Sequence, residues 1–140
     1  MVDYWVDGSN KLDQKFSFGC VVVEDGEVIH TAHKGYENHE YCSNRNVAGE
    51  CFGALYAVQH ALNHGYTHIN IYYDYMGIQK WGDREWKGNK PLSKMYIDSI
   101  QRANATGLQI NFIKVKAHTG VEYNELADTL AKRGLEEDNI

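Results

Sequence analysis

Four carboxylates, far apart in the chain, stand where a negative charge is unusual. Two directly follow apolar stretches typical of strands, and two lie on the apolar sides of expected helices: Asp7, Asp74, Glu50 and Asp128. A buried charge is costly unless it is neutralised, and all-oxygen ligands suit magnesium or manganese. Two such ions about 4 Å apart can activate a water on one side of a phosphate and stabilise the leaving oxygen on the other. The residues therefore predict metal-dependent cleavage of a phosphodiester backbone.

Each carboxylate alone also has a structural interpretation. A strand-terminal aspartate is usually a turn former, and a glutamate in the first turn of a helix complements the helix dipole. Their joint placement favours function. If the strands before Asp7 and Asp74 are parallel neighbours, both side chains emerge at the carboxyl edge of the sheet, where open α/β sheets bind ligands.

The N-terminal part predicts an antiparallel meander. Residues 2–6 are rich in β-branched and aromatic residues and are expected to end as a strand at Asp7. Residues 16–23 and 27–32 are two further strands, and Asp25-Gly26 between them suits a two-residue hairpin turn.

The rest of the chain alternates helical and strand patterns. Thr119 and Glu122 form a capping box that predicts the start of the last helix. The expected elements are helix 46–63, strand 68–73, a helical turn at 77–81, a helix beginning at Pro91, strand 108–115 and the C-terminal helix. This order predicts an α/β fold with a five-stranded mixed sheet, an antiparallel meander plus two parallel strands, and helices on both faces.

The composition fits one domain over residues 1–140, with an acidic tail at about 136–140. No apolar stretch approaches the ~20 residues that span a bilayer, and three cysteines are too few and too irregular for a disulfide framework. We therefore expect a cytoplasmic protein without a membrane partner. The net charge of −5 opposes binding of a polyanion, although two divalent cations would bring it to −1.

Several motifs resemble those of the type 1 ribonuclease H family. Asp7-Gly8-Ser9 resembles the first-strand motif, Asn46-Val47-Ala48-Gly49-Glu50 the first-helix glutamate motif, and Tyr73-Asp74 the fourth-strand aspartate. The most specific part lies within residues 115–128, where His-x-Gly is followed by Asn-Glu-x-Ala-Asp. The resemblance covers nearly the whole chain and implies a ribonuclease H-like fold.

The resemblance also implies an activity. Members of the family hydrolyse the RNA strand of RNA·DNA hybrids endonucleolytically, leaving 5′-phosphate and 3′-hydroxyl ends. They use two Mg²⁺ ions, with Mn²⁺ as a substitute, and no organic cofactor. The four carboxylates match the metal ligands, and His118 matches a loop histidine that assists proton transfer or product release; otherwise His118 is a loop histidine near a helix N-terminus. We expect a monomer.

Substrate contacts follow from the same resemblance. Gly8, Ser9 and Asn46 match positions that sense the minor groove and the RNA 2′-hydroxyls. Arg45 lies near a DNA-phosphate pocket. The other expected contacts are Asn124, within the Asp128 motif, and Trp81, which resembles an aromatic of the DNA-strand groove but fits the core equally well.

The chain departs from the family at two places. Tyr75 follows the third aspartate where serine or asparagine is usual, so contacts made there are expected to differ from those of the family. Residues 84–90 are much shorter than the basic protrusion of some members, which implies weaker substrate affinity.

Other functions remain as alternatives. A nuclease of the same fold acting on double-stranded RNA, or a transposase-like strand transferase, fits the carboxylates. A non-catalytic hybrid-binding module predicts a missing carboxylate, and none is missing.

Two histidine groups have mainly structural interpretations. The irregular spacing of His30, His33, His39 and Cys42 argues against zinc, and His60 and His64 lie where imidazoles complement a helix dipole.

Overall fold

The computed structural model describes residues 1–116 and 122–136. Along the chain the elements are β1 (Val2–Lys11), β2 (Lys15–Glu24), β3 (Glu27–Glu37), the 3₁₀ turn η1 (Cys42–Asn44), α1 (Asn46–Asn63), β4 (His68–Tyr73), α2 (Gly77–Gly82), α3 (Pro91–Ala105), β5 (Gln109–Lys114) and α4 (Glu122–Glu136).

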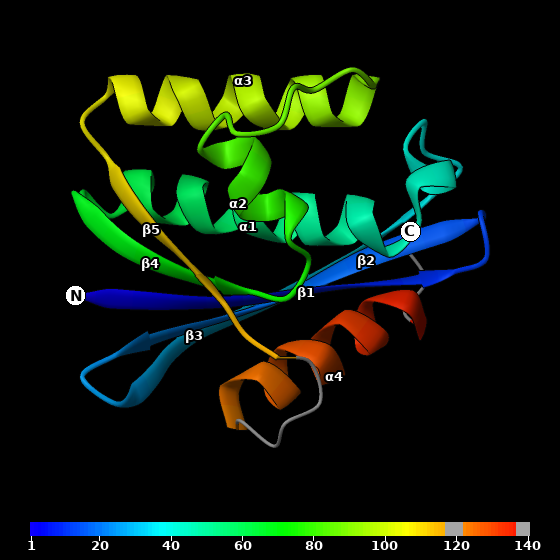
Figure 1. Ribbon diagram of the computed structural model, residues 1–140. Coiled ribbons are helices and arrows are strands. Elements are labelled where there is room, and N and C mark those ends of the chain that lie inside the picture. The colour runs from blue at the N-terminus through cyan, green and yellow to red at the C-terminus, as the bar shows by residue number, and fades with distance from the viewer. Residues whose placement is uncertain (117–121, 137–140) are drawn as a thin grey trace.

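The five strands form one mixed sheet in the order β3-β2-β1-β4-β5. The pairs β1–β2 and β2–β3 are antiparallel, whereas β1–β4 and β4–β5 are parallel. Figure 1 shows α1, α2 and α3 on one side of the sheet and α4 on the other. The predicted fold class, a ribonuclease H-like α/β fold with a five-stranded mixed sheet and helices on both faces, is confirmed.

Two predicted strand ends were wrong. The first strand does not end at Asp7 but continues to Lys11, because antiparallel pairing with β2 runs on from Asp7 to Lys11. Parallel pairing with β4 stops at Trp5, so Asp7 lies just beyond the point where β4 leaves β1. The third strand continues past Ala32 to Glu37, again because β2 supplies backbone partners. A run of polar residues hid both extensions from the hydrophobic pattern.

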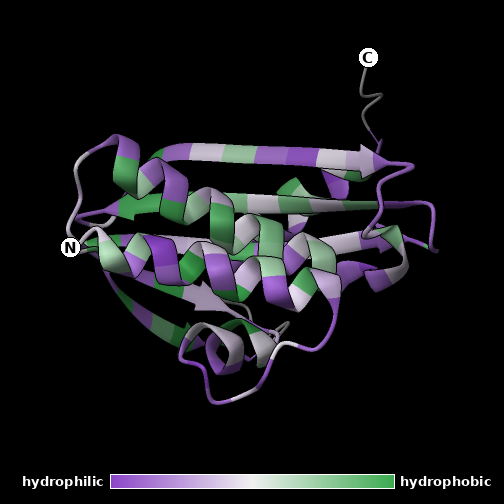
Figure 2. Cartoon of the chain, turned by 90° about the horizontal axis from the view of Figure 1, so that it is seen from above, coloured by the Kyte–Doolittle hydropathy of each residue, from purple (hydrophilic) through white to green (hydrophobic). Residues whose placement is uncertain are grey.

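Hydrophobic side chains pack on both faces of the sheet. The larger cluster lies between the sheet and α1, and α3 packs outside α1. The smaller cluster lies under α4 and joins Trp5 and Val21 of the sheet to Ala127 and Leu130. Figure 2 shows hydrophobic residues concentrated in the central strands and alternating with polar ones along the helices. Hydrophobic packing therefore stabilises both faces of the sheet around β1 and β4, the strands that position the aspartates.

Two sequence-based expectations about the environment can be compared with the described residues. All three cysteines, Cys20, Cys42 and Cys51, are buried and free. Within residues 1–116 and 122–136, no helix has the length and apolar character needed to cross a membrane. The capping residue Thr119 lies outside the described residues.

Candidate active site

Two glycines allow α1 to approach β1 closely enough to bring Glu50 next to Asp7. A Cβ at Gly8 would overlap the backbone of Asn46 and Glu50, and a Cβ at Gly49 would overlap the carbonyl oxygen of Ser17. Since any side chain would push the helix away, the first turn of α1 lies directly against the sheet. The contact places Glu50 at the sheet surface, 2% exposed.

Three of the four carboxylates converge. Asp7, Glu50 and Asp74 each offer an oxygen, and these oxygens all lie within 4.8 Å of one another. Glu50 comes from α1, Asp7 from β1, and Asp74 from the residue after β4. The parallel pairing of β1 with β4 thus brings the two aspartates together, as the sequence predicted.

Backbone groups orient this cluster. The amides of Asp74 and Tyr75 donate to Glu50 Oε1 at 3.0 and 3.4 Å, and the amide of Gly8 donates to Asp7 Oδ1 at 2.9 Å. These donors hold Glu50 and Asp7 in place. Tyr75 takes part through its backbone amide, so its departure from the usual residue type leaves this contact intact.

Asp128 joins the cluster from α4 through Asp7. Its side chain is in hydrogen-bonding contact with Asp7, and its Oδ2 accepts a hydrogen bond from Lys132 Nζ at 3.0 Å. The Asp128 side chain is 24% exposed, so it lies at the open side of the site. The four predicted carboxylates therefore lie together although they come from four elements.

The cluster is electrostatically unfavourable when all its members are ionised. Burial raises the pKa of Asp7 to about 7, with further contributions from the charge of Asp74 and from the hydrogen bond and charge of Asp128. Burial and the charges of Asp7 and Asp74 raise the pKa of Glu50 well above its usual value. Ionisation of the whole cluster therefore requires a counter-charge, which a bound cation would supply.

The donor set fits hard divalent cations. Carboxylate oxygens at this spacing are the ligands that Mg²⁺ and Mn²⁺ prefer, and the group contains neither thiolate nor imidazole. Glu50 is buried without a cationic side chain among its described partners, and a bound ion would provide the missing charge.

The predicted substrate contacts differ in position. Gly8 and Ser9 follow Asp7 on β1, and both are partly exposed. Asn46 is exposed at the first position of α1. Arg45 precedes it with φ +56°, and its Nε donates to Asp13 Oδ1 at 2.7 Å. Gly8 and Ser9 thus follow the carboxylate Asp7 in sequence, and Arg45 and Asn46 lie at the start of the helix that carries Glu50.

The remaining predicted site residues are Asn124, Trp81 and His118. Asn124 is 7% exposed in the first turn of α4. Trp81 packs partly buried against the main core, with its ring 6.0 Å from that of Trp86, which is 41% exposed. His118 lies outside the described residues.

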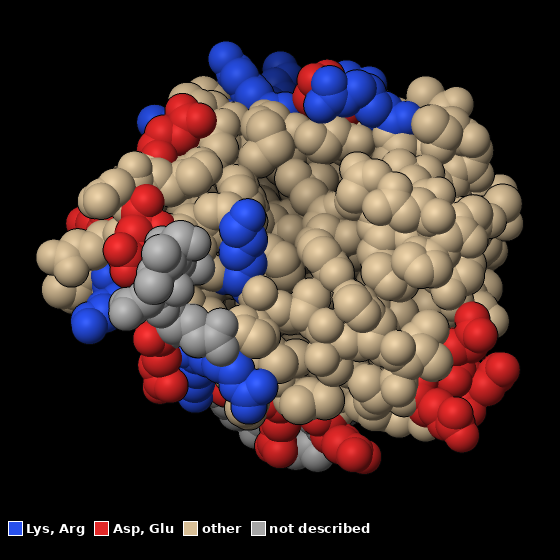
Figure 3. Space-filling view, turned by 180° about the vertical axis from the view of Figure 1, so that it is seen from behind, with Lys and Arg blue, Asp and Glu red and all other residues tan. Residues whose placement is uncertain are grey.

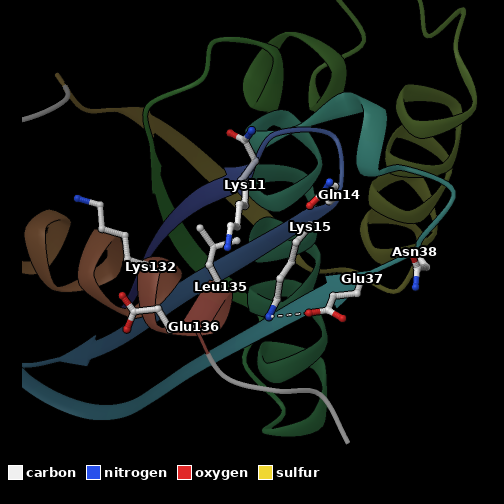
Figure 4. A pocket seen from close by; sticks show the side chains of 9 residues that line it. Lys11, Gln14, Lys15, Glu37, Asn38, Lys132, Leu135 and Glu136 are labelled. Carbon is white, nitrogen blue, oxygen red and sulfur yellow. Dashed lines mark ion pairs between the residues drawn. The ribbon is translucent and has the colours of Figure 1, made fainter.

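A basic pocket between β1, β2 and α4 was not anticipated. It has a volume of about 810 Å³. Its lining includes Lys11, Lys15 and Lys132 together with Glu37 and Glu136 (Figure 4). Lys15 pairs with Glu37 at 3.3 Å. Lys132 connects the pocket to the site because it also pairs with Asp128. The i,i+4 spacing of that pair was a signal in the sequence, whereas the position of Lys11 depends on the unexpected extension of β1.

In the part of the chain that the structure describes, the other histidine and cysteine candidates do not converge as three metal ligands. Among the described residues, the group of carboxylates is the one set of three or more metal-binding side chains with converging atoms. His30, His33, His39 and Cys42 are not members of this set.

Comparison with known proteins relates the chain to a family. The family model for ribonuclease H matches residues 1–136. The ribonuclease H1 of Halobacterium salinarum has a similar structure at 20% identity and a TM-score of 0.82, covering 98% of each chain. The N-terminal ribonuclease H domain of a Mycobacterium tuberculosis protein has a TM-score of 0.79 at 19% identity, covering 96% of this chain and 93% of that one.

A third structure was solved with nucleic acid. The LC11 ribonuclease H1 in complex with an RNA/DNA hybrid has a TM-score of 0.77 at 13% identity, covering 96% of this chain and 99% of that one. A search of curated protein sequences found no significant match. The structural likenesses show a shared fold, and the family model covers almost all of the sequence. The chain belongs to the ribonuclease H family.

Proposed function

We propose that this protein hydrolyses the RNA strand of RNA·DNA hybrids endonucleolytically, leaving 5′-phosphate and 3′-hydroxyl ends. The observation that supports the proposal most directly is the convergence of Asp7, Glu50 and Asp74 within 4.8 Å, with Asp128 in contact with Asp7. Membership of the ribonuclease H family and the structural likeness to an enzyme solved with a hybrid support the choice of substrate.

Each side chain has a role in this proposal. The four carboxylates would hold two Mg²⁺ ions, with Mn²⁺ as a substitute, and when bound these ions supply an activated water and stabilisation of the leaving oxygen. Glu50, fixed by the amides of Asp74 and Tyr75, provides a rigid anchor beneath the site. Asp7 and Asp128 lie toward the side where Lys132 is exposed. His118 is proposed to assist proton transfer or product release.

We also propose residues that would contact the substrate. Gly8 and Ser9 on β1 and Asn46 on α1 would contact the minor groove, where a 2′-hydroxyl distinguishes RNA from DNA. Arg45 would bind a DNA phosphate. Trp81 and Asn124 are further proposed contacts, and the partly buried Trp81 would act through the edge that remains accessible.

The proposal includes a single-domain, monomeric enzyme that acts in the cytoplasm. Three free, buried thiols are compatible with a reducing compartment. A nuclease of the same fold that cuts double-stranded RNA is the main alternative. The presence of all four carboxylates disfavours a non-catalytic hybrid-binding module.

The test compares three labelled duplexes: an RNA·DNA hybrid, duplex RNA and duplex DNA. Each is incubated with the protein in Mg²⁺, Mn²⁺ or a chelator, and the products are separated by length and their ends determined. We expect cleavage of the hybrid's RNA strand alone, and none with the chelator. Activity without metal, or equal cutting of duplex DNA, would refute the proposal, and equal cutting of duplex RNA would favour the alternative.

A matched pair of variants assigns the activity to the site. Asp74→Asn removes one ligand charge and should lower the rate by roughly a hundredfold or more, since ligand charge holds the ions. Asp98→Asn, an exposed aspartate of α3 that faces Arg102, makes the same chemical change away from the carboxylates. It should leave the rate unchanged, and an equal loss in both variants would contradict the assignment.

A further inference from the structure

A second group of potential metal ligands lies at the other end of α1. His60 and His64 are one helical turn apart, and their rings stack with centroids 4.0 Å apart. His30 of β3 stacks against His60 with centroids 4.8 Å apart. The ring of His60 thus has the ring of His64 on one side and that of His30 on the other. Ten residues of helix, about 15 Å, separate it from Glu50.

Hydrogen bonds constrain both helix histidines. His64 Nδ1 lies 2.8 Å from the carbonyl oxygen of His60, and a carbonyl can only accept, so Nδ1 carries the proton and Nε2 has a free lone pair. His60 Nδ1 lies 2.7 Å from the hydroxyl of the buried Tyr4. When that nitrogen donates to the hydroxyl, Nε2 of His60 is unprotonated as well.

This is the arrangement that metal-binding histidines use. A ligating imidazole usually donates its other N–H to a carbonyl, carboxylate or water, which fixes its tautomer and its orientation. Two histidines four residues apart on a helix are the zinc-binding pair of one known motif, and His60 and His64 have this spacing, with His64 at the C-cap of α1. The described residues provide no other hydrogen-bond partner for Nε2 of either ring.

We propose that His60 and His64 form a second cation site that binds a borderline divalent transition ion of the Zn²⁺ or Ni²⁺ class through their Nε2 atoms. His64 is exposed, so an ion can reach the pair from solvent. His30 and Tyr4 hold His60 in position. Imidazole ligands favour this class of ion over Mg²⁺, which prefers oxygen.

The proposal concerns residues outside the carboxylate site and does not depend on the nuclease function. It also differs from the structural role that the sequence suggested for this pair. Bound at the last turn of α1, the ion would join two successive turns at the point where the helix ends at His64.

The test uses an untagged protein carrying Asp74→Asn, so that the carboxylate site binds ions weakly. Titration calorimetry with ZnCl₂ and with NiCl₂, in excess Mg²⁺, should show one ion bound per chain. His64→Ala removes one ligand from an exposed position and should weaken binding by roughly tenfold to a hundredfold. His68→Ala removes a histidine that bonds Asn111 and should bind as tightly as the parent.

The ring ¹⁵N resonances provide a direct readout in the same protein. Addition of Zn²⁺ should shift the Nε2 signals of His60 and His64 and leave those of His68 in place. The proposal is overturned if His64→Ala binds Zn²⁺ and Ni²⁺ as tightly as the parent, if no binding is detected, or if the shifts occur at other histidines. Circular dichroism of each variant confirms that a lost site does not reflect a lost fold.

Discussion

At the scale of single residues, the carboxylates of the site repel one another when they are ionised. Asp7 is 8% exposed and Glu50 2% exposed, and both face other acidic groups. The proximity raises the pKa of both side chains, with burial as the largest cause. In the absence of a cation, the residues that make the site chemically useful therefore reduce the stability of the fold near neutral pH.

Stability of the metal-free protein should consequently depend on pH in a defined direction. The folded-state pKa of Asp7 is raised from 3.8 to about 7, so its contribution to stability is fully present below about pH 4 and is lost as the pH rises through 7. Glu50 shifts in the same direction. Urea unfolding in chelator should give a free energy of unfolding lower by about 1–3 kcal/mol at pH 8 than at pH 5 from these groups.

Magnesium and one variant separate this effect from other titrations. Mg²⁺ should raise the free energy of unfolding more at pH 8 than at pH 5, because protons compete with the ion for the same oxygens. Asp7→Asn should reduce the pH-dependent loss in chelator. If the wild type and Asp7→Asn lose stability equally between the two pH values, Asp7 does not titrate as described.

At the scale of elements, the contact between α1 and β1 decides whether the site forms. Glycines at positions 8 and 49 let two backbones meet where a side chain would intervene. The helix N-terminal turn then lies on the strand that carries Asp7. The separation of α1 and β1, and not the length of either element, therefore sets the distance between Glu50 and Asp7.

Two alanine substitutions in α1 test this contact. Alanine favours helix over glycine by about 1 kcal/mol at either position. A Cβ at Gly53 would lie 3.2 Å from the Val6 Cβ, a tight but adjustable contact, whereas one at Gly49 would overlap backbone. Gly49→Ala should therefore destabilise the protein by about 1–3 kcal/mol and lower its affinity for Mg²⁺, while Gly53→Ala should change either little.

Thermal unfolding and magnesium titration of both variants provide the measurement. A Gly49→Ala protein as stable as Gly53→Ala would mean that α1 can shift without cost. Unchanged magnesium affinity in a destabilised Gly49→Ala protein would mean that the site tolerates the shift.

At the scale of the whole molecule, charge is unevenly distributed. The net charge of −5 suggests poor attraction for a nucleic acid. Figure 3 shows basic side chains gathered over the α3 side of one face, with acidic ones along other parts of its rim. The pocket between β1, β2 and α4 is lined by Lys11 and Lys132 (Figure 4), and Lys132 also pairs with Asp128. The lysines of this pocket are therefore the candidates for phosphate contact beside the site, despite the acidic total.

Binding of a hybrid should depend on salt through these lysines. If Lys11 contacts a phosphate, Lys11→Ala should weaken hybrid binding and reduce the slope of log Kd against log salt by about one. Arg102→Ala, in the last turn of α3, provides a control with the same loss of charge. Fluorescence anisotropy with a labelled hybrid in chelator, or in Ca²⁺, measures binding without cleavage. Equal slopes for Lys11→Ala and the wild type would exclude Lys11 from the interface.

The sequence alone determined the order and type of the elements and the identity of the four carboxylates. The helix 46–63 and the strand 68–73 match α1 and β4, because side-chain periodicity is a local property. Asp7, Glu50, Asp74 and Asp128 stood out because each interrupts such a pattern. The family resemblance was confirmed, while the role of His118, outside the described residues, stays a prediction.

Only the tertiary structure decided how far β1 extends, that Lys11 and Lys132 border one pocket, and that His30 stacks on His60. Each depends on residues far apart in sequence, whose distance is set by strand register and by the packing of α1 and α4 on opposite faces. A local sequence pattern carries no information about such distances. The convergence of the carboxylates was predictable as a topology, but their separation within 4.8 Å required the close approach of two backbones.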